Sequence, residues 1–149
     1  MTHNRLADLE PWAKSILNSL EPKARKPLLR QMAMALRREN QKRITAQTDP
    51  EGQKWQPRRN SGGKVAKKKK MMLGLRKARS MRIKAYAEGF TLGFPDDRTS
   101  KIARIHHYGL RQYIAGRNVQ YPKRELLGIT TKDRAIMQNI LIAHIQTKT

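Results

Sequence analysis

Apolar residues near the start of the chain recur at three- and four-residue intervals, the spacing of a helix with one buried face. The first run predicts a helix over about 9–19, with Asp8 as its cap and Pro11 in its first turn. A second run predicts a longer helix over about 23–47. At about 1.5 Å per residue this helix exceeds the width of a domain of this size, so its polar far end is expected to project towards a partner.

Further along, the apolar spacing changes from the helical period to alternation. Met81, Ile83 and Ala85 alternate with polar residues, and a second alternating run follows over 90–94. A glycine turn separates the two runs, which is typical of an antiparallel hairpin. The sequence therefore predicts a small antiparallel sheet built on a β-hairpin over about 80–95.

A short helix is predicted next, over about 99–108. Thr99 or Ser100 can cap its start, and Gly109 stands where helices favour a left-handed residue.

The last third of the chain ends in another predicted helix. Residues 110–128 have no regular pattern apart from a strand near 119–121. Thr130 and Asp133 have the spacing of a capping box, which predicts a C-terminal helix over about 131–146. The predicted class is α+β, with two N-terminal helices, a small sheet and a C-terminal helix.

Charge adds a feature that the apolar pattern does not show. The chain has 149 residues, the size of one domain, and a formal net charge of +22. Residues 52–87 hold 13 basic side chains and no acidic one. We interpret residues 1–149 as one domain with a basic, flexible loop inserted at about 48–70, since like charges repel and its glycines add backbone freedom.

An enzyme is not expected from this sequence. Asp96 and Asp97 read as a solvated turn before a helix, and adjacent His106 and His107 diverge by about 100° on a helix, so neither pair predicts catalysis or metal binding. His144 is expected at the edge of the core. The chain has no cysteine, and no cofactor or metal site is predicted.

The basic stretch is the main candidate for a binding surface. It could bind nucleic acid without sequence preference, or it could order only inside a protein assembly. No aromatic residue lies between 62 and 85 to stack on bases, which favours assembly. Trp55 is expected to anchor the loop on the core. The predicted contacts to an acidic partner are Arg58, Arg59, Lys64, Lys67, Lys68, Lys69, Lys70, Arg76 and Lys77.

Membranes are the least favoured partner. The N-terminus lacks the order of a secretory signal, and no apolar run approaches the roughly 20 residues of a membrane span, so we expect a soluble protein. The helix predicted over 23–47 gives only a weak basic and apolar amphipathic pattern.

Five segments form an ordered series along the chain: 43–52 with Trp55, 73–78, 91–94, 102–109 and 121–128. Taken together, they resemble the phage virion morphogenesis, or tail completion, protein family of contractile-tailed temperate phages. One departure is His107, which stands where the family often has glutamine.

This resemblance implies a non-enzymatic assembly factor that finishes the tail and enables its joining to the DNA-filled head. The implied form is a homo-oligomeric ring at the top of the tail, with six subunits to match the symmetry of the tube. The implied partners are the tail tube and head–tail connector proteins, and contact with DNA in the neck is left open. The implied location is the virion, at the tail end or neck, after assembly in the host cytoplasm.

Overall fold

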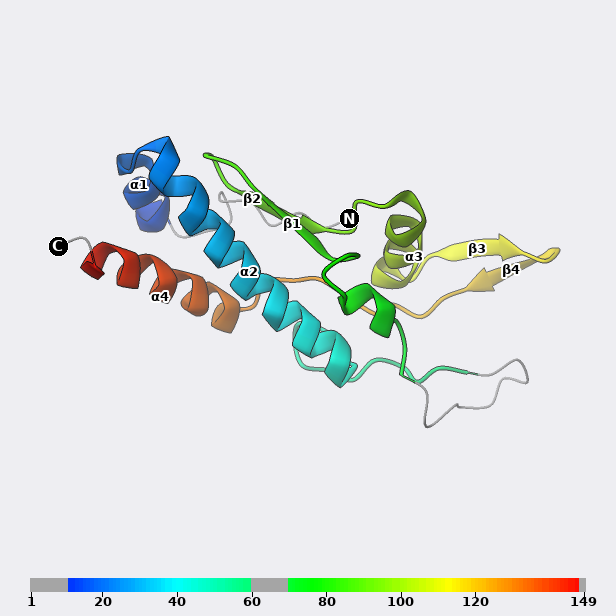
Figure 1. Ribbon diagram of the computed structural model, residues 1–149. Coiled ribbons are helices and arrows are strands. Elements are labelled where there is room, and N and C mark those ends of the chain that lie inside the picture. Colours follow the sequence, from blue (N-terminus) through cyan, green and yellow to red (C-terminus); the bar gives the residue numbers. More distant parts are fainter. Residues whose placement is uncertain (1–10, 60–69, 148–149) are drawn as a thin grey trace.

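A computed structural model describes residues 11–59 and 70–147 of the chain (Figure 1). Helices at both ends and antiparallel hairpins between them confirm the predicted α+β class. The described strands form two separate two-stranded sheets, in place of the single small sheet expected. In chain order the elements are α1 (Pro11–Ser19), α2 (Pro22–Ala46), the 3-10 helix η2 (Leu73–Arg76), β1 (Arg82–Ala85), β2 (Phe90–Gly93), α3 (Asp97–Tyr108), β3 (Arg111–Ile114), β4 (Arg117–Gln120) and α4 (Thr131–Thr147).

Helix α2 runs through the middle of the fold, with α4 and the β1–β2 hairpin packed along it (Figure 1). Its buried residues extend over nearly its whole length: Leu28, Leu29, Met32, Ala33, Leu36, Asn40 and Ile44. The expected projection of its far end is therefore wrong. Ile44 is fully buried because two later segments, near Trp55 and Arg76, return to this end of the helix.

The β1–β2 hairpin confirms the strands predicted over 80–95. Its strands pair antiparallel, with Ala85 opposite Phe90 in the last pair before the turn. The buried side chains of Phe90 and Leu92 belong to the same apolar core as those of α2. The alternation in the sequence is visible because one face of this hairpin is buried.

Helix α3 begins earlier than its sequence predicts. The carboxylate of Asp96 accepts hydrogen bonds from the backbone N–H and the hydroxyl of Thr99, both at 3.0 Å, so Asp96 is the N-cap and not Thr99 or Ser100. Gly109 is confirmed as the left-handed end, with φ of 64°. A Cβ atom there would lie 2.8 Å from the backbone nitrogen of Lys123, so no side chain fits.

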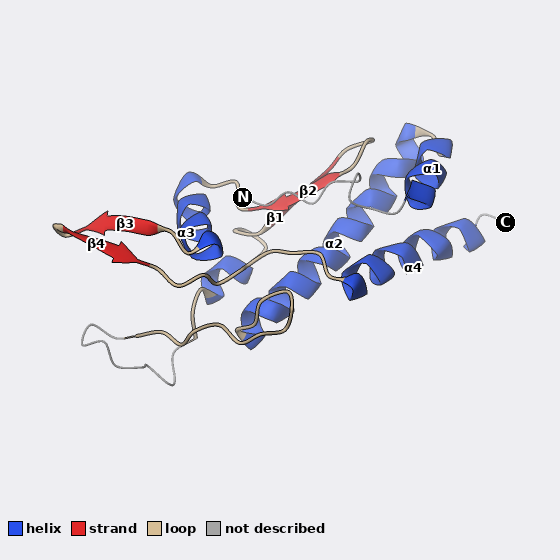
Figure 2. Cartoon of the chain, turned by 180° about the vertical axis from the view of Figure 1, so that it is seen from behind, coloured by secondary structure: helices blue, strands red, loops and turns tan. Residues whose placement is uncertain are grey.

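Strands β3 and β4 form a hairpin in the region predicted to be irregular. Its turn residues, Ala115 and Gly116, both have positive φ, at 51° and 81°, as the tight two-residue hairpin turn with matching twist requires. None of its strand residues is buried, and the hairpin extends away from the helices (Figure 2). A hairpin with both faces exposed to solvent has no alternation of apolar and polar residues, so the sequence predicts only a short strand near β4.

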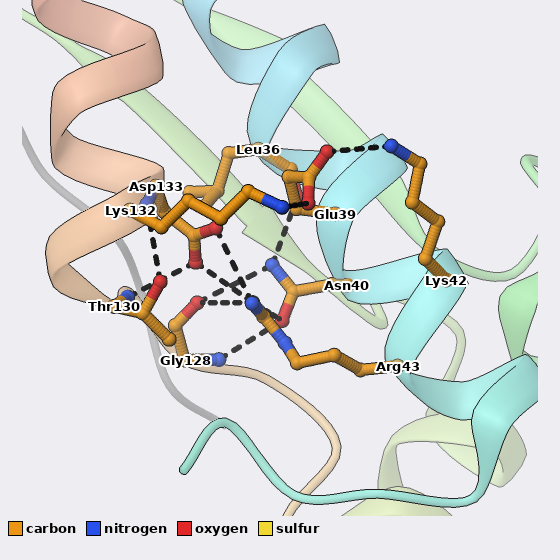
Figure 3. A network of polar contacts seen from close by, with 9 residues as sticks. All are labelled: Leu36, Glu39, Asn40, Lys42, Arg43, Gly128, Thr130, Lys132 and Asp133. Atoms are coloured by element: carbon orange, nitrogen blue, oxygen red, sulfur yellow. Dashed lines mark hydrogen bonds and ion pairs between the residues drawn. The ribbon is translucent and has the colours of Figure 1, made fainter. Parts of the chain in front are cut away.

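A buried polar network fixes α4 against α2 (Figure 3). Asp133 forms the predicted capping box with Thr130: each backbone N–H donates to the other side chain, at 3.0 and 3.1 Å. The same carboxylate accepts two hydrogen bonds from the guanidinium of Arg43, the shorter at 2.9 Å. Fully buried Asn40 completes the network through both backbone groups of Gly128.

Candidate assembly interface

The basic segment leaves and re-enters the fold at the C-terminal end of α2. Gln47 ends the helix in the left-handed region, at φ of 59°. Its side-chain amide bonds Met71 in both directions: the amide nitrogen donates to the Met71 carbonyl at 2.9 Å, and its oxygen accepts from the Met71 N–H at 2.6 Å. One side chain therefore joins the two ends of the basic segment.

Two lysines of this region bind the end of α2. Lys54 Nζ donates to the carbonyl of Ala46 at 3.0 Å, and Lys70 Nζ donates to that of Thr45 at 2.9 Å. A cation at this end of a helix meets its unpaired carbonyls and the negative end of its dipole. Lys70 thus has an intramolecular partner in addition to its predicted role at an interface.

Arg76 also bonds within the chain. Its guanidinium donates to the hydroxyl of Thr45 at 3.0 Å, and its carbonyl accepts from the side chain of Gln41 at 2.7 Å. Gln41 and Thr45, at the polar far end of α2, therefore contact the returning chain.

The start of the basic segment is ordered. The Trp55 N–H donates to the Gln47 carbonyl at 2.8 Å, and Thr48 forms a β-bridge with Lys54. The Trp55 side chain is buried in the core, where its indole Nε1 finds no partner among the described residues. Residues 48–55 of the predicted loop form a hydrogen-bonded turn packed on α2.

The remaining predicted contacts fall into two groups. Arg58, Arg59 and Lys77 are exposed. Lys64, Lys67, Lys68 and Lys69 lie outside the described residues, as does the part of the predicted flexible loop over 60–69.

Arg124 is a member of this region that the sequence did not single out. Its side chain is only 4% exposed, and it donates from Nε to the carbonyl of Gln56 at 2.9 Å and from Nη2 to that of Pro57 at 3.3 Å. Burial lowers the pKa of this guanidinium. A lone arginine in a polar stretch gives no sign of burial, so no sequence signal could have found it.

The two adjacent histidines of α3 face different surroundings. The ring of His106 meets Tyr121 edge-on, at 5.1 Å between ring centres, while His107 meets Tyr108 at 4.6 Å. Burial is the main cause that lowers the pKa of both, and nearby Arg124 adds to the effect at His106. His107 Nδ1 accepts the backbone N–H of Leu126 at 3.1 Å, which fits a neutral ring with a role in packing.

Within residues 11–59 and 70–147, no three histidine or acidic side chains come together as a metal site would require. Asp96 is used as a helix cap, and the hydrogen bonds from Thr99 hold its pKa below the ordinary range. No helix in the same ranges has the length and apolar character needed to span a bilayer.

The chain belongs to a class of phage assembly proteins: it is a member of the phage virion morphogenesis family, which it matches over residues 5–146. Among its relatives is tail completion protein S of Escherichia phage P2, which is 32% identical over 150 residues. That alignment covers 96% of this chain and 99% of the relative. No solved structure matches this protein.

Proposed function

We propose that this protein is a structural subunit that completes a phage tail and enables the tail to join the head. The similarity to tail completion protein S carries the proposal, because the alignment extends over nearly all of both chains. The role requires positioning of other virion proteins and no catalysed reaction or cofactor. The protein would act in the virion, at the tail end or neck, after assembly in the host cytoplasm.

The proposed working form is a ring, with six subunits to match a six-fold tail tube. Head-to-tail rings need two different complementary surfaces on each subunit. The exposed cations Arg58, Arg59 and Lys77 and the lysines of 64–69 would meet acidic surfaces of tube, connector or neighbouring subunit. Six copies per completed tail, counted by quantitative mass spectrometry of purified virions, are expected, and a single copy would exclude the ring.

Electron microscopy of lysates tests the role itself. A phage carrying an early stop codon in this gene is expected to give filled heads beside unattached tails. Over-long or ragged tails would narrow the role to a terminator of tube growth. Normal virions in normal numbers would contradict the proposal.

The alternative function is sequence-independent nucleic-acid binding through the basic stretch 52–87. It predicts that the purified protein retards duplex DNA at about 150 mM salt, with a steep loss of binding as salt rises. It also predicts activity in the absence of any tail.

Charge reversal in the loop tests the proposed interface. Replacing Lys67, Lys68 and Lys69 by glutamate is expected to leave the fold intact and abolish tail completion. Lys70 is excluded because its Nζ binds the end of α2. The control reverses Lys14, Lys23 and Lys26, three exposed lysines on α1 and α2, and is expected to remain infectious. Full infectivity of the loop variant would remove the loop from the interface.

A further inference from the structure

A pocket of about 770 Å³ lies between the outgoing basic segment and the end of the β3–β4 hairpin. Residues from four parts of the chain line it, so it is a product of the tertiary fold. Its described lining is Gln56, Pro57, Arg58, Arg59, Met71, His106, Val119, Gln120, Tyr121, Pro122 and Arg124.

The charged side chains that line this pocket are all positive. Arg58, Arg59 and Arg124 are cationic, and none of the described lining residues is acidic. Arg124 is the buried member, and the hydrogen bonds shown for it go to backbone carbonyls, which leave its full charge uncompensated. A buried cation without a counter-charge is costly, and a carboxylate or phosphate brought to it would offset that cost.

His106 adds a second unused polar group. Its Nδ1 is buried and has no hydrogen-bond partner among the described residues. The ring also lines the pocket, next to Arg124. An unpaired buried polar atom is uncommon in folded proteins and calls for a ligand or an ordered water.

Apart from Gln56 and Gln120, the rest of the lining is apolar or aromatic. Pro57, Met71, Val119, Tyr121 and Pro122 surround the charged groups. Such walls suit the carbon stems of side chains on a peptide, and they suit the hydrated outer surface of a DNA duplex poorly. A duplex is also convex and wide, so its phosphates would reach exposed Arg58 and Arg59 more easily than recessed Arg124.

We propose that this pocket binds an acidic, partly apolar segment of another virion protein, with a carboxylate directed at Arg124 and His106. That the partner is a virion protein rests on the proposed function, whereas the carboxylate-binding chemistry rests on the pocket alone. In this arrangement Arg58 and Arg59 attract the segment at the rim, and Arg124 receives one side chain in the interior.

Peptide binding by the full-length protein tests the chemistry without any phage. The probe is a synthetic peptide of alternating glutamate and leucine, and the control probe has glutamine at each glutamate. At about 150 mM salt, where exposed charges farther apart than about 8 Å are screened, the acidic peptide is expected to bind saturably and the glutamine peptide at least 10-fold more weakly. NMR should show shifts of the His106 ring and the Arg124 Nε resonance, and the pKa of His106 should rise when the carboxylate arrives.

Matched variants distinguish binding of the acidic peptide in the pocket from its nonspecific electrostatic attraction to a basic protein. Replacing Arg58 and Arg59 by glutamine should weaken the acidic peptide at least 10-fold. Replacing Lys14 and Lys101, two exposed lysines on α1 and α3, by glutamine removes the same charge and should change binding less than 2-fold. Arg124→Lys keeps the charge but loses the planar guanidinium, and it should weaken binding while circular dichroism confirms the fold.

Three results would overturn the proposal that this pocket binds an acidic segment. They are equal weakening by the two double variants, equal binding of the two peptides, and shifts of His106 and Arg124 by a 20-base-pair duplex with none by the acidic peptide. Peptide binding by the protein combined with normal virions from the stop-codon phage would retain the pocket and reject the proposed function.

Discussion

Charged residues are used in different ways in the body around α2 and at the basic end of the molecule, which comprises Arg58, Arg59, Arg124 and the β3–β4 hairpin beside them. In the body, the Arg43 guanidinium meets the Asp133 carboxylate, and both groups are enclosed by further hydrogen bonds (Figure 3). At the basic end, Arg124 is more deeply buried than Arg43 yet is shown only with carbonyl partners. The Arg43 guanidinium has its counter-charge within the chain, so folding explains this pair, while its Nε has no hydrogen-bond partner among the described residues. At the basic end, Arg124 has no acidic partner among the hydrogen bonds shown for it, as expected of a surface that binds a partner.

The largest effect is expected from breaking the network of the body. Asp133→Ala removes the partner of Arg43 and the cap of α4 together. Because Asp133 is 1% exposed and Arg43 15%, we expect the free energy of unfolding to fall by about 3 kcal/mol. Urea unfolding of the purified protein measures this.

The control for this prediction is Glu39→Ala. Glu39 pairs with the exposed lysines Lys42 and Lys132, at 2.8 and 4.0 Å. Both lysines are more than 70% exposed, and ion pairs to solvated lysines contribute little, so a loss below about 1 kcal/mol is expected. Equal losses for the two variants would show that burial of the network adds nothing.

A smaller effect is expected at Gly128, where the chain passes closest to the turn after α2. A Cβ atom at this position would lie 2.5 Å from Cγ of Pro50, whose ring cannot rotate away. Gly128→Ala should therefore lower the free energy of unfolding by about 1–3 kcal/mol. Gly93→Ala is the matched control, since a Cβ there meets nothing within 4 Å, and it should change stability by less than about 0.5 kcal/mol.

The elements of the body could be predicted because their signals are local. The capping box at Thr130, the left-handed Gly109 and the alternating strands of 80–95 each depend on residues a few positions apart. The surroundings of the far end of α2 could not be predicted in this way. Gln41, for example, binds a carbonyl that lies 35 residues later in the chain.

The positive charge of the basic end could be predicted from the sequence, but the position and contacts of each of its side chains could not. Composition identifies a cationic segment, but it cannot divide its members into helix-binding Lys70 and exposed Arg58. The recessed Arg124 and the orphan nitrogen of His106 arise only when separate segments meet. The β3–β4 hairpin has no buried face, so its sequence shows no apolar alternation beyond the strand predicted near 119–121.

The pH dependence of stability tests the burial of His107. Burial lowers the pKa of His107 below its ordinary value of about 6.5, with a smaller opposing effect from Glu125. The unfolded chain therefore binds the proton more readily, so the stabilisation is complete above pH 6.5 and is lost as pH falls through 6.5 towards the folded pKa. The slope from one histidine is at most about 1.4 kcal/mol per pH unit.

Urea unfolding between pH 7.5 and 5 measures this slope. His107→Gln retains an oxygen that can accept the Leu126 N–H and removes one of the two buried histidines, so it should reduce the slope and leave the part due to His106. Identical slopes for the variant and the wild type would show that His107 does not carry the effect.

The smallest effect on stability, combined with a large effect on assembly, is expected at the tip of the β3–β4 hairpin. Tyr113 is 72% exposed, and Ile114, beside it near the turn, is 46% exposed. An isolated two-stranded hairpin with both faces in water is only marginally stable, so bulky side chains there gain little until a partner covers them. Tyr113→Ser should change the free energy of unfolding by less than about 0.5 kcal/mol and reduce the yield of complete virions at least 10-fold.

Tyr86→Ser tests whether any exposed tyrosine would give the same result. Tyr86 is 40% exposed, but it follows β1 and lies near Lys84, on the hairpin that packs against α2. If the basic end alone meets a partner, this variant should assemble normally, since its hairpin already has a buried face. Normal yields from Tyr113→Ser, or equal defects from both variants, would mean that exposure on this protein does not mark the assembly surface, and the contrast between the two regions would then be one of folding alone.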